Sequence, residues 1–134
     1  MFQILVIDDD KNIRYFIKEA LELHKYTVFT AVNGKEALNI LDVQHIDLVI
    51  VDIMMPEMDG YEFTKTIRST NENLPILMMS AKQLSLDRKK GFLAGIDDYM
   101  TKPIDLEELW LHIKALLKRY KIESERKLVI GNVT

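Results

Sequence analysis

The stretch Leu48-Val49-Ile50-Val51-Asp52 places a carboxylate directly after an unbroken run of apolar residues. A run of this kind is typical of a strand that is buried on both faces, as in the interior of a parallel sheet. A carboxylate at the end of such a strand is costly unless something there uses its charge. Asp52 is therefore the first candidate for a functional residue.

Three other strand-like segments end in the same way. The polar residues at their ends are Asp8 with Asp9, Ser80 and Lys102. Ligands of doubly wound sheets bind outside the carboxyl ends of the strands, so we expect these side chains to lie near Asp52. Together they supply the carboxylates, the hydroxyl and the ammonium that can hold a divalent cation and a phosphoryl group.

Strand and helix patterns alternate along the chain. Strands are expected at residues 4–7, 26–32, 48–51, 76–79 and 97–101, and helices at about 13–21, 33–41, 60–69, 83–94 and 105–120. These units predict an α/β domain with a doubly wound parallel sheet and helices on both faces. The helical pattern is weakest at 83–94, because Gly91 interrupts it. This helix is either a moving part beside the charged site or simply a short helix.

Length and composition are those of one globular domain. The chain has 134 residues, 48% hydrophobic and 29% charged, and its net charge of -3 does not indicate nucleic-acid or membrane binding. It has no cysteine and no signal-peptide pattern, so we expect a cytoplasmic protein that binds no membrane. We expect the domain at residues 1–120. The charged stretch 121–127 and the strand-like 128–130 indicate a linker and a remnant of another unit at 121–134.

The aspartates at this edge predict a metal site. Asp8, Asp9 and Asp52 would repel one another at close range and raise one another's pKa. A hard cation relieves this repulsion, and oxygen ligands favour Mg²⁺ or Mn²⁺. Alternatively, Asp8–Asp10 only cap the following helix, and for Asp10 we prefer this interpretation. Capping explains neither Asp52 nor the apolar run before it.

Asp52 can act as a nucleophile that forms an aspartyl phosphate. Phosphoryl transfer needs in-line attack and neutralisation of the phosphoryl oxygens rather than an elaborate acid–base relay. Lys102 can supply positive charge and Ser80 a hydrogen bond. The Lys102–Pro103 bond is either cis, which could aim the lysine into the site, or part of a plain trans turn.

In this order, the motifs resemble those of the receiver domain of bacterial two-component response regulators. The matching segments are residues 4–10, 52–60, 75–82 and 95–103, and the similarity extends from Gln3 to about Arg119. The resemblance implies the flavodoxin-like, or CheY-like, fold with parallel strands in the order 2-1-3-4-5. It also implies that a sensor histidine kinase transfers a phosphoryl group to Asp52 in a Mg²⁺-dependent reaction.

The resemblance further implies a metal site made of particular residues. Mg²⁺ would be bound by Asp9, by Asp52 and by the backbone carbonyl of Met54, and Asp8 would assist through water. In receivers, the side chains at the positions of Met54 and Lys82 influence the access of water to the phosphoryl group. We hypothesise that the bulky, non-acidic Met54 slows hydrolysis of the aspartyl phosphate.

The remaining implied roles concern the switch. Lys102 and Ser80 would bind the phosphoryl group, and Tyr99 would turn inward with Ser80. This motion would change the face made by the fourth helix, the fifth strand and the fifth helix. Such a domain is not an enzyme, because it catalyses only its own phosphorylation and dephosphorylation.

Within the family, the chain resembles the OmpR/PhoB subfamily of DNA-binding regulators. Residues 121–134 would then contain a linker and the first strand of a winged-helix domain, and DNA would be bound only through that effector domain, which this chain lacks. Active receivers of this subfamily form homodimers through the switch face. The residues that match its ion pairs are Arg88 with Glu108 and Asp98 with Arg119. Ala94 and His112 stand where an acid and an arginine are usual, which weakens the dimer prediction.

Several alternatives remain at this level. A stand-alone receiver or a phosphorylation-independent interaction module would have the same fold. A haloacid-dehalogenase-type phosphatase would need a second acid two residues after its nucleophile, where this chain has Met54. A flavin-binding protein would need a hydroxyl-rich loop where Asp8–Asp10 would repel a phosphate. The histidines share no spacing with the acids and are typical of surface or boundary positions; they are His24, His45 and His112.

Overall fold

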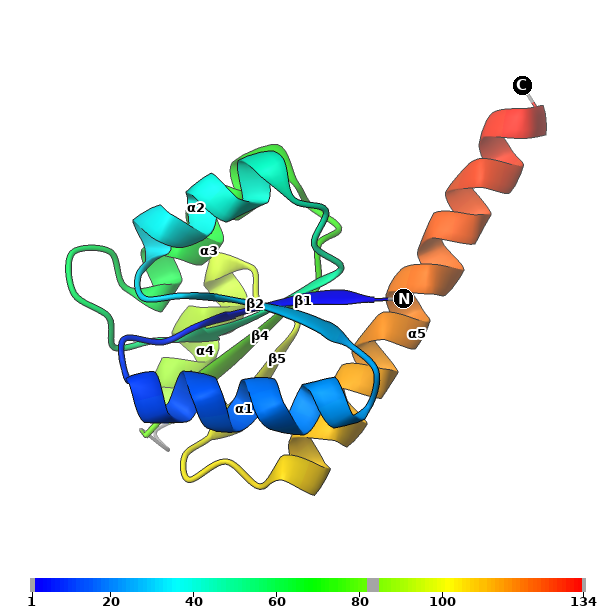
Figure 1. Ribbon diagram of the computed structural model, residues 1–134. Helices are drawn as coiled ribbons and strands as arrows, with labels where there is room; N and C mark the ends of the chain where they lie inside the picture. Colours follow the sequence, from blue (N-terminus) through cyan, green and yellow to red (C-terminus); the bar gives the residue numbers. More distant parts are fainter. Residues whose placement is uncertain (1, 82–84, 134) are drawn as a thin grey trace.

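A computed structural model describes residues 2–81 and 85–133 and shows five strands alternating with five helices (Figure 1). The strands are β1 (Gln3–Ile7), β2 (Thr27–Ala31), β3 (Leu48–Asp52), β4 (Ile76–Ser80) and β5 (Asp98–Thr101). The helices are α1 (Lys11–Leu23), α2 (Gly34–Val43), α3 (Gly60–Thr70), α4 (Ser85–Ala94) and α5 (Leu106–Val133). The predicted alternation is confirmed.

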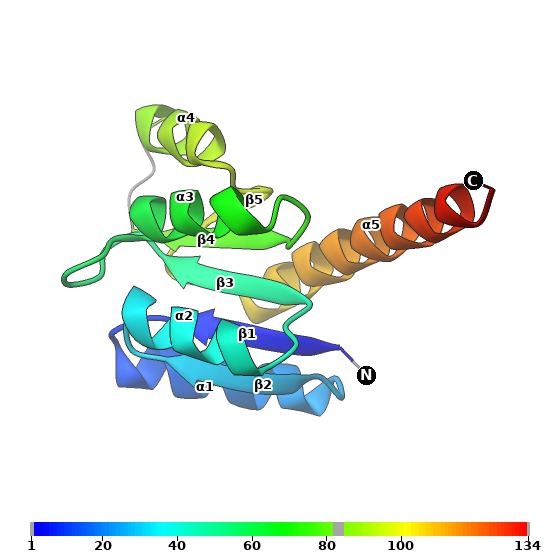
Figure 2. The ribbon, with the colours of Figure 1, turned by 90° about the horizontal axis from the view of Figure 1, so that it is seen from above.

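All strands are parallel, and their order is β2-β1-β3-β4-β5, as Figure 2 shows from above. This is the order implied by the resemblance. The chain moves outward from β1 to β2 and then returns to β3 on the other side of β1, so the strand order reverses between β1 and β3. A doubly wound sheet forms its ligand site at this reversal, beyond the carboxyl ends of the two strands.

The two faces of the sheet are covered by different helices (Figure 1). Because successive side chains of a strand point to opposite faces, Val49 and Val51 pack under α2 and α3, whereas Leu48 and Ile50 pack against α1 and α5. All four side chains are fully buried. This burial on both faces explains the continuous apolar run before Asp52.

Side-chain caps begin the helices beside the sheet's carboxyl edge. Asp10 caps α1, Asn33 caps α2 and Asp59 caps α3, each by accepting hydrogen bonds from backbone N–H groups of the first helical turn. Asp105 accepts in the same way from two N–H groups at the start of α5. Each cap contributes about 1 kcal/mol to stability. The capping interpretation of Asp10 is confirmed.

The last helix is longer than expected. α5 continues past Tyr120 to Val133 and projects beyond the body of the domain (Figure 1), so residues 128–130 lie in a helix rather than in the expected strand. The reason is that the sequence has no proline after Pro103 and no glycine between Gly95 and Gly131, so nothing interrupts the helix. The division into a domain at 1–120 and a linker with a remnant stays a prediction.

A stacked pair joins the end of α1 to the start of α5. The ring of His24 lies 4.3 Å from that of Trp110, with 13° between their planes, and the Lys114 ammonium lies 4.4 Å from the Trp110 centroid. Trp110 is the chain's single tryptophan. This stack closes the α1–α5 seam on one face of the sheet.

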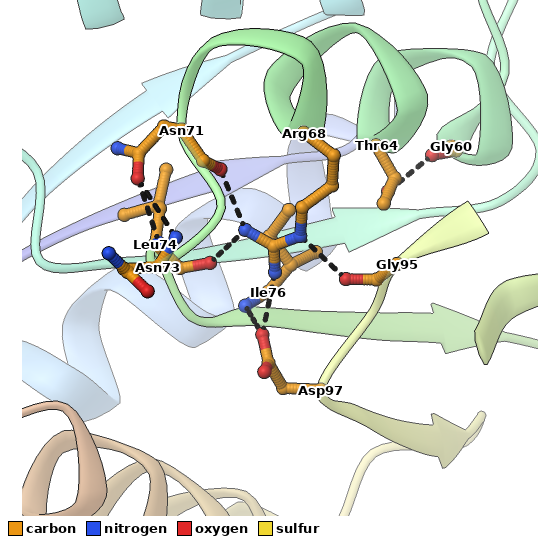
Figure 3. A network of polar contacts seen from close by, with 9 residues as sticks. All are labelled: Gly60, Thr64, Arg68, Asn71, Asn73, Leu74, Ile76, Gly95 and Asp97. Carbon is orange, nitrogen blue, oxygen red and sulfur yellow. Dashed lines mark hydrogen bonds and ion pairs between the residues drawn. The ribbon is translucent and has the colours of Figure 1, made fainter. Parts of the chain in front are cut away.

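On the other face, Arg68 at the end of α3 ties three segments together (Figure 3). Its guanidinium donates to the carbonyl oxygens of Gly95 (2.7 Å), Leu74 (2.7 Å) and Asn71 (3.1 Å), and it pairs with Asp97 at 2.8 Å. Gly95 has φ +114, and a Cβ there would lie 2.7 Å from Arg68 Cγ, so only glycine fits. We call this network the Arg68 clasp.

No helix among residues 2–81 and 85–133 is both long enough and apolar enough to span a bilayer. The longest of them, α5, alternates apolar residues with many charged ones. This agrees with the absence of a membrane-sized apolar run in the sequence.

Candidate functional site

The structure brings three aspartates together at the reversal point of the sheet. Asp8 directly follows β1 and Asp52 ends β3, and both are buried, with exposed fractions of 0% and 4%. Asp9 is exposed beside them. One carboxylate oxygen of each lies within 4.8 Å of those of the other two. These residues form an acidic pocket that is open on the side of Asp9.

Lys102 enters this pocket from the loop after β5. Its ammonium lies 3.0 Å from Asp8 Oδ2 and 3.2 Å from Asp52 Oδ1. Its backbone N–H donates to the carbonyl of Ser80, at 2.7 Å, and its bond to Pro103 is cis. The pocket therefore holds one ammonium against three carboxylates.

The excess of carboxylates changes the proton affinity of Asp52. Burial, and then the negative charge of Asp8, raise the pKa of Asp52 from 3.8 to about 6; Lys102 opposes this shift and Asp9 adds to it. Burial lowers the pKa of Lys102, but its hydrogen bond to Asp8 and the charge of Asp52 outweigh burial and leave that pKa raised. Ionised Asp52 is thus costly in the folded chain, and an added cation would relieve that cost.

The donor set of the pocket fits a hard divalent cation. It contains carboxylate oxygens only, one from an exposed side chain, with room for water ligands on the open side. No sulfur or imidazole takes part in the cluster, which disfavours zinc or copper and favours Mg²⁺ or Mn²⁺. Met54 lies two residues beyond Asp52, in the loop that borders the site.

Backbone contacts hold Asp8 in place. Its N–H donates to the carbonyl of Ala31 (3.2 Å), its Oδ1 accepts from the N–H of Asp10 (2.9 Å), and its carbonyl accepts from Arg14 Nη1 (2.6 Å). Asp8 therefore has a fixed orientation and a direct bond to Lys102, a contact that sequence reasoning missed. It also missed Arg14, whose place one turn into α1 gives no signal of this role.

Gly60 sets the distance between α3 and the backbone of Asp52. Its N–H donates to the carbonyl of Ile53 at 3.0 Å, and Thr64 Oγ1 donates to the carbonyl of Gly60 at 2.8 Å (Figure 3). A Cβ at Gly60 would lie 2.7 Å from the carbonyl oxygen of Asp52. Any side chain there would displace the backbone that carries the Asp52 carboxylate.

Of the residues assigned to the switch, Ser80 lies at the end of β4 and Tyr99 lies within β5. Ser80 ends β4 and is fully buried, one residue past Met79, which pairs with Asp52 across the sheet. Tyr99 is buried, and the guanidinium carbon of Arg88 lies 5.4 Å from its ring centroid. Lys82, whose position in receivers influences the access of water to the phosphoryl group, lies outside the described residues.

The four residues assigned to the dimer face lie on α4, β5 and α5. Arg88, Glu108 and Arg119 are exposed, and Asp98 is half-buried. His112 contacts both acids: its Nδ1 lies against Asp98 Oδ2, and its Nε2 lies 3.5 Å from Glu108 Oε1. The sequence indicated a boundary position for His112 but not these contacts.

Comparisons with known proteins agree with this geometry. A family model described as the response regulator receiver domain matches residues 4–114. The heme response regulator HssR of Staphylococcus aureus (strain Newman) is 38% identical over all 134 residues of this chain, which correspond to 59% of the relative. The chain thus spans about three fifths of the length of the curated relatives it matches.

Solved structures agree as well. The receiver domain of the Francisella response regulator 1452 has a TM-score of 0.84 and 37% identity, over 89% of this chain and 98% of that one. A CheY-like receiver domain protein from Methanospirillum hungatei JF-1 has a TM-score of 0.87 and 27% identity, over 92% of this chain and 98% of that one.

Proposed function

Since the chain belongs to the response regulator receiver domain family, we propose that Asp52 accepts a phosphoryl group from a sensor histidine kinase in a Mg²⁺-dependent reaction. The observation that carries this proposal is the acidic pocket itself. At the reversal point of the sheet, the buried carboxylate of Asp52 contacts a lysine and lies beside two further carboxylates, and its pKa is raised to about 6. Such perturbed, clustered groups are typical of functional sites.

The chemistry follows from the positions of these side chains. A carboxylate oxygen of Asp52 attacks the phosphorus of the donor phosphohistidine, and the P–N bond breaks as the new P–O bond forms. Asp9, Asp52 and the Met54 carbonyl would hold Mg²⁺, which supplies charge neutralisation on the phosphoryl oxygens. Asp8, already fixed by Lys102, would act through water.

Lys102 and Ser80 complete the proposed binding of the phosphoryl group. Lys102 already contacts Asp52 Oδ1, so its ammonium can move to a phosphoryl oxygen when that carboxylate becomes an acyl phosphate. Ser80 is next to Met79, the partner of Asp52 in the sheet, and its hydroxyl can donate to a second oxygen. These changes would reach Tyr99 in the adjacent strand and so alter the α4–β5–α5 face.

Phosphorylation would lead the chain to form a homodimer through this face, and this dimerisation would control transcription. In the dimer, Arg88 would pair with Glu108, and Asp98 with Arg119. Exposed apolar side chains on both helices, Leu93 at 88% and Leu111 at 53%, suit such an interface. The greater length of the relatives fits an OmpR/PhoB-like regulator that binds DNA through a further domain, and we propose that this regulator is cytoplasmic.

Two other functions fit less well. A pure interaction module would not need Asp9, Asp52, Ser80 and Lys102 at one edge. A dehalogenase-type phosphatase lacks its second acid, because Met54 holds that position with its side chain exposed. We therefore assign no enzymatic activity beyond the chain's own phosphorylation and dephosphorylation.

Incubation with acetyl phosphate and Mg²⁺, followed by intact mass measurement, tests the proposal. The wild type and the control Asp42→Asn, which removes an exposed carboxylate at the far end of α2, should each gain one phosphoryl group. Asp52→Asn should gain none, and chelation of Mg²⁺ should abolish the reaction. Phosphorylation of Asp52→Asn to the wild-type extent would contradict the assignment.

Replacement of Lys102 separates chemistry from switching. Lys102→Ala should still accept the phosphoryl group, but its α4–β5–α5 face should respond less, which NMR chemical shifts of Tyr99 and its neighbours would report. A full response in this variant would contradict the role of Lys102.

A further inference from the structure

Met54 differs from the other methionines in the part of the chain that the structure describes. Its side chain is 59% exposed, in the loop that borders the acidic pocket. The others are buried or half-buried; they are Met55, Met58, Met78, Met79 and Met100. An oxidant dissolved in water therefore reaches the sulfur of Met54 before it reaches theirs.

Helices cover the sulfurs of the methionines elsewhere in the domain. A Cβ at Gly34 would lie 2.7 Å from Met58 Sδ, so this sulfur packs directly against the first turn of α2. A Cβ at Gly91 would lie 3.4 Å from Met78 Sδ, which is therefore covered by α4. Oxidation of either sulfur requires a helix to move away, whereas oxidation of Met54 does not.

The loop after β3 fixes the backbone of Met54 beside the acceptor. The carbonyl of Ile53 accepts from the N–H of Met55 at 3.2 Å and from the N–H of Gly60 at 3.0 Å. These two bonds hold a turn that begins directly after Asp52, the last residue of β3. A chemical change of the Met54 side chain would therefore act at the rim of the pocket, while the turn keeps its shape.

We propose that Met54 is a site of reversible oxidation by peroxides, and that its oxidation shortens the lifetime of the phosphorylated chain. This rests on the proposed function, in which Asp52 carries the phosphoryl group. A lone pair of the sulfur attacks one oxygen of hydrogen peroxide, and the S–O bond forms as the O–O bond breaks. The proton of the attacked oxygen passes to the leaving hydroxide, which departs as water. The sulfur loses two electrons to the peroxide, and the resulting methionine sulfoxide is returned to methionine by sulfoxide reductases.

The expected consequence follows from the polarity of the new group. A thioether is apolar and a weak hydrogen-bond acceptor, so it keeps water from the rim of the pocket. A sulfoxide is polar, and its oxygen accepts hydrogen bonds from water. Hydrolysis of an aspartyl phosphate needs a water molecule beside the phosphorus. The backbone carbonyl of Met54 is unchanged by the oxidation, so the oxidised chain should still accept a phosphoryl group.

Limited treatment of the chain with hydrogen peroxide, followed by peptide mapping with mass spectrometry, tests the oxidation site. Met54 should gain one oxygen before Met58 and Met79 do, and fragment ions distinguish the methionines of one peptide. Methionine sulfoxide reductase should then remove this oxygen. Met1 lies outside the described residues and is reported by a separate peptide.

The lifetime of the phosphorylated chain tests the consequence, measured by intact mass after acetyl phosphate and Mg²⁺ are removed. The oxidised wild type should lose its phosphoryl group about threefold faster than the untreated wild type, and the reductase should restore the lifetime. Met54→Leu, of similar volume but without sulfur, should have the same lifetime before and after peroxide. Met58→Leu, a matched control that removes the neighbouring half-buried sulfur, should respond to peroxide as the wild type does.

Three results would overturn the proposal: oxidation of Met58 or Met79 as early as that of Met54, an unchanged lifetime in the oxidised wild type, or the same peroxide-induced loss in Met54→Leu. If the untreated chain gained no phosphoryl group at all, the proposed function would fail and the lifetime effect with it. The peptide map would still decide where peroxide reacts, so the two failures are distinguishable.

Discussion

Two charged clusters lie near the sheet, and they differ in how their charges are balanced. In the Arg68 clasp, one guanidinium donates to three carbonyl oxygens and pairs with the single carboxylate of Asp97. In the acidic pocket, one ammonium faces three carboxylates. The clasp is complete within the chain, whereas the pocket carries uncompensated negative charge.

The difference separates a structural cluster from a binding site. A buried polar network whose donors and acceptors are all matched stabilises one arrangement of the chain. A buried cluster with excess charge of one sign lowers stability until a ligand of opposite sign arrives. Removing charge should therefore have opposite effects on stability in the two places.

The largest effect is expected in the clasp. Arg68→Ala should lower the free energy of unfolding by about 3 kcal/mol, because it removes the cationic partner of Asp97 and a hydrogen-bond donor from the carbonyl groups of Leu74 and Gly95. Urea denaturation followed by circular dichroism measures this. Lys65→Ala, an exposed change in the same helix, should stay within about 0.5 kcal/mol of the wild type. Equal effects of the two changes would remove the contrast between the clusters.

Asp52→Asn should act in the opposite direction and stabilise the metal-free chain by about 1–2 kcal/mol at pH 7. The pKa of Asp52 has its ordinary value of 3.8 in the unfolded chain and is about 6 in the folded chain. Ionisation of Asp52 is therefore disfavoured in the folded chain by about 1.4 kcal/mol per pKa unit. Lys102 loses a charged partner, which offsets part of the gain.

The pH dependence checks the sign of this second effect. Because the folded pKa is the higher one, the destabilisation by Asp52 is absent below pH 4 and grows until about pH 6. The stability advantage of Asp52→Asn should therefore be small at pH 4 and reach its full value above pH 6. If Asp52→Asn were less stable than the wild type at pH 7, the charges of the acidic pocket would already be balanced within the chain.

An effect of similar size is expected from Mg²⁺. At a concentration about ten times its dissociation constant, Mg²⁺ should stabilise the wild type by about 1.4 kcal/mol, since it binds the folded state only. Asp9→Asn should reduce this gain, whereas Lys65→Ala should keep it. Thermal unfolding with and without the ion measures the difference, and Ca²⁺ at the same concentration tests selectivity.

The smallest effect concerns the rim of the pocket. Met54 is exposed beside Asp52, and a smaller, polar side chain should admit water more easily to the phosphoryl group. Met54→Asn should shorten the lifetime of the phosphorylated chain about threefold, or about 0.7 kcal/mol in the barrier. Intact mass over time after removal of the phosphodonor measures the lifetime. An unchanged lifetime would contradict the hypothesis.

The sheet could be predicted from the sequence because its inner strands are apolar on both faces. Val49 and Ile50 point to opposite faces of the sheet and are both buried, so no polar residue interrupts the apolar pattern that indicates a strand. The length of α5 could not be predicted in this way. Residues 128–130 are apolar and partly β-branched, which favours a strand locally, but no proline or glycine between Pro103 and Gly131 interrupts the helix.

The convergence of the residues at the strand ends could also be predicted from the sequence. Parallel strands bring their carboxyl ends to one edge, so Asp8, Asp52 and Lys102, which end or directly follow their strands, converge there. The contacts of Arg14, Arg68 and His112 could not be foreseen. Each side chain lies on a helix and contacts a residue outside that helix: Asp8 for Arg14, Gly95 for Arg68 and Asp98 for His112. No local sequence pattern encodes these contacts.

The stack between α1 and α5 has a practical consequence. Because Trp110 is the only indole in the chain, all of the chain's tryptophan fluorescence reports on the contact between α1 and α5 at His24 and Lys114. The acidic pocket lies at the far end of α1 and contains no fluorophore of this kind. A spectral change on adding a metal or a phosphodonor would therefore measure movement transmitted along the helices, not occupancy itself.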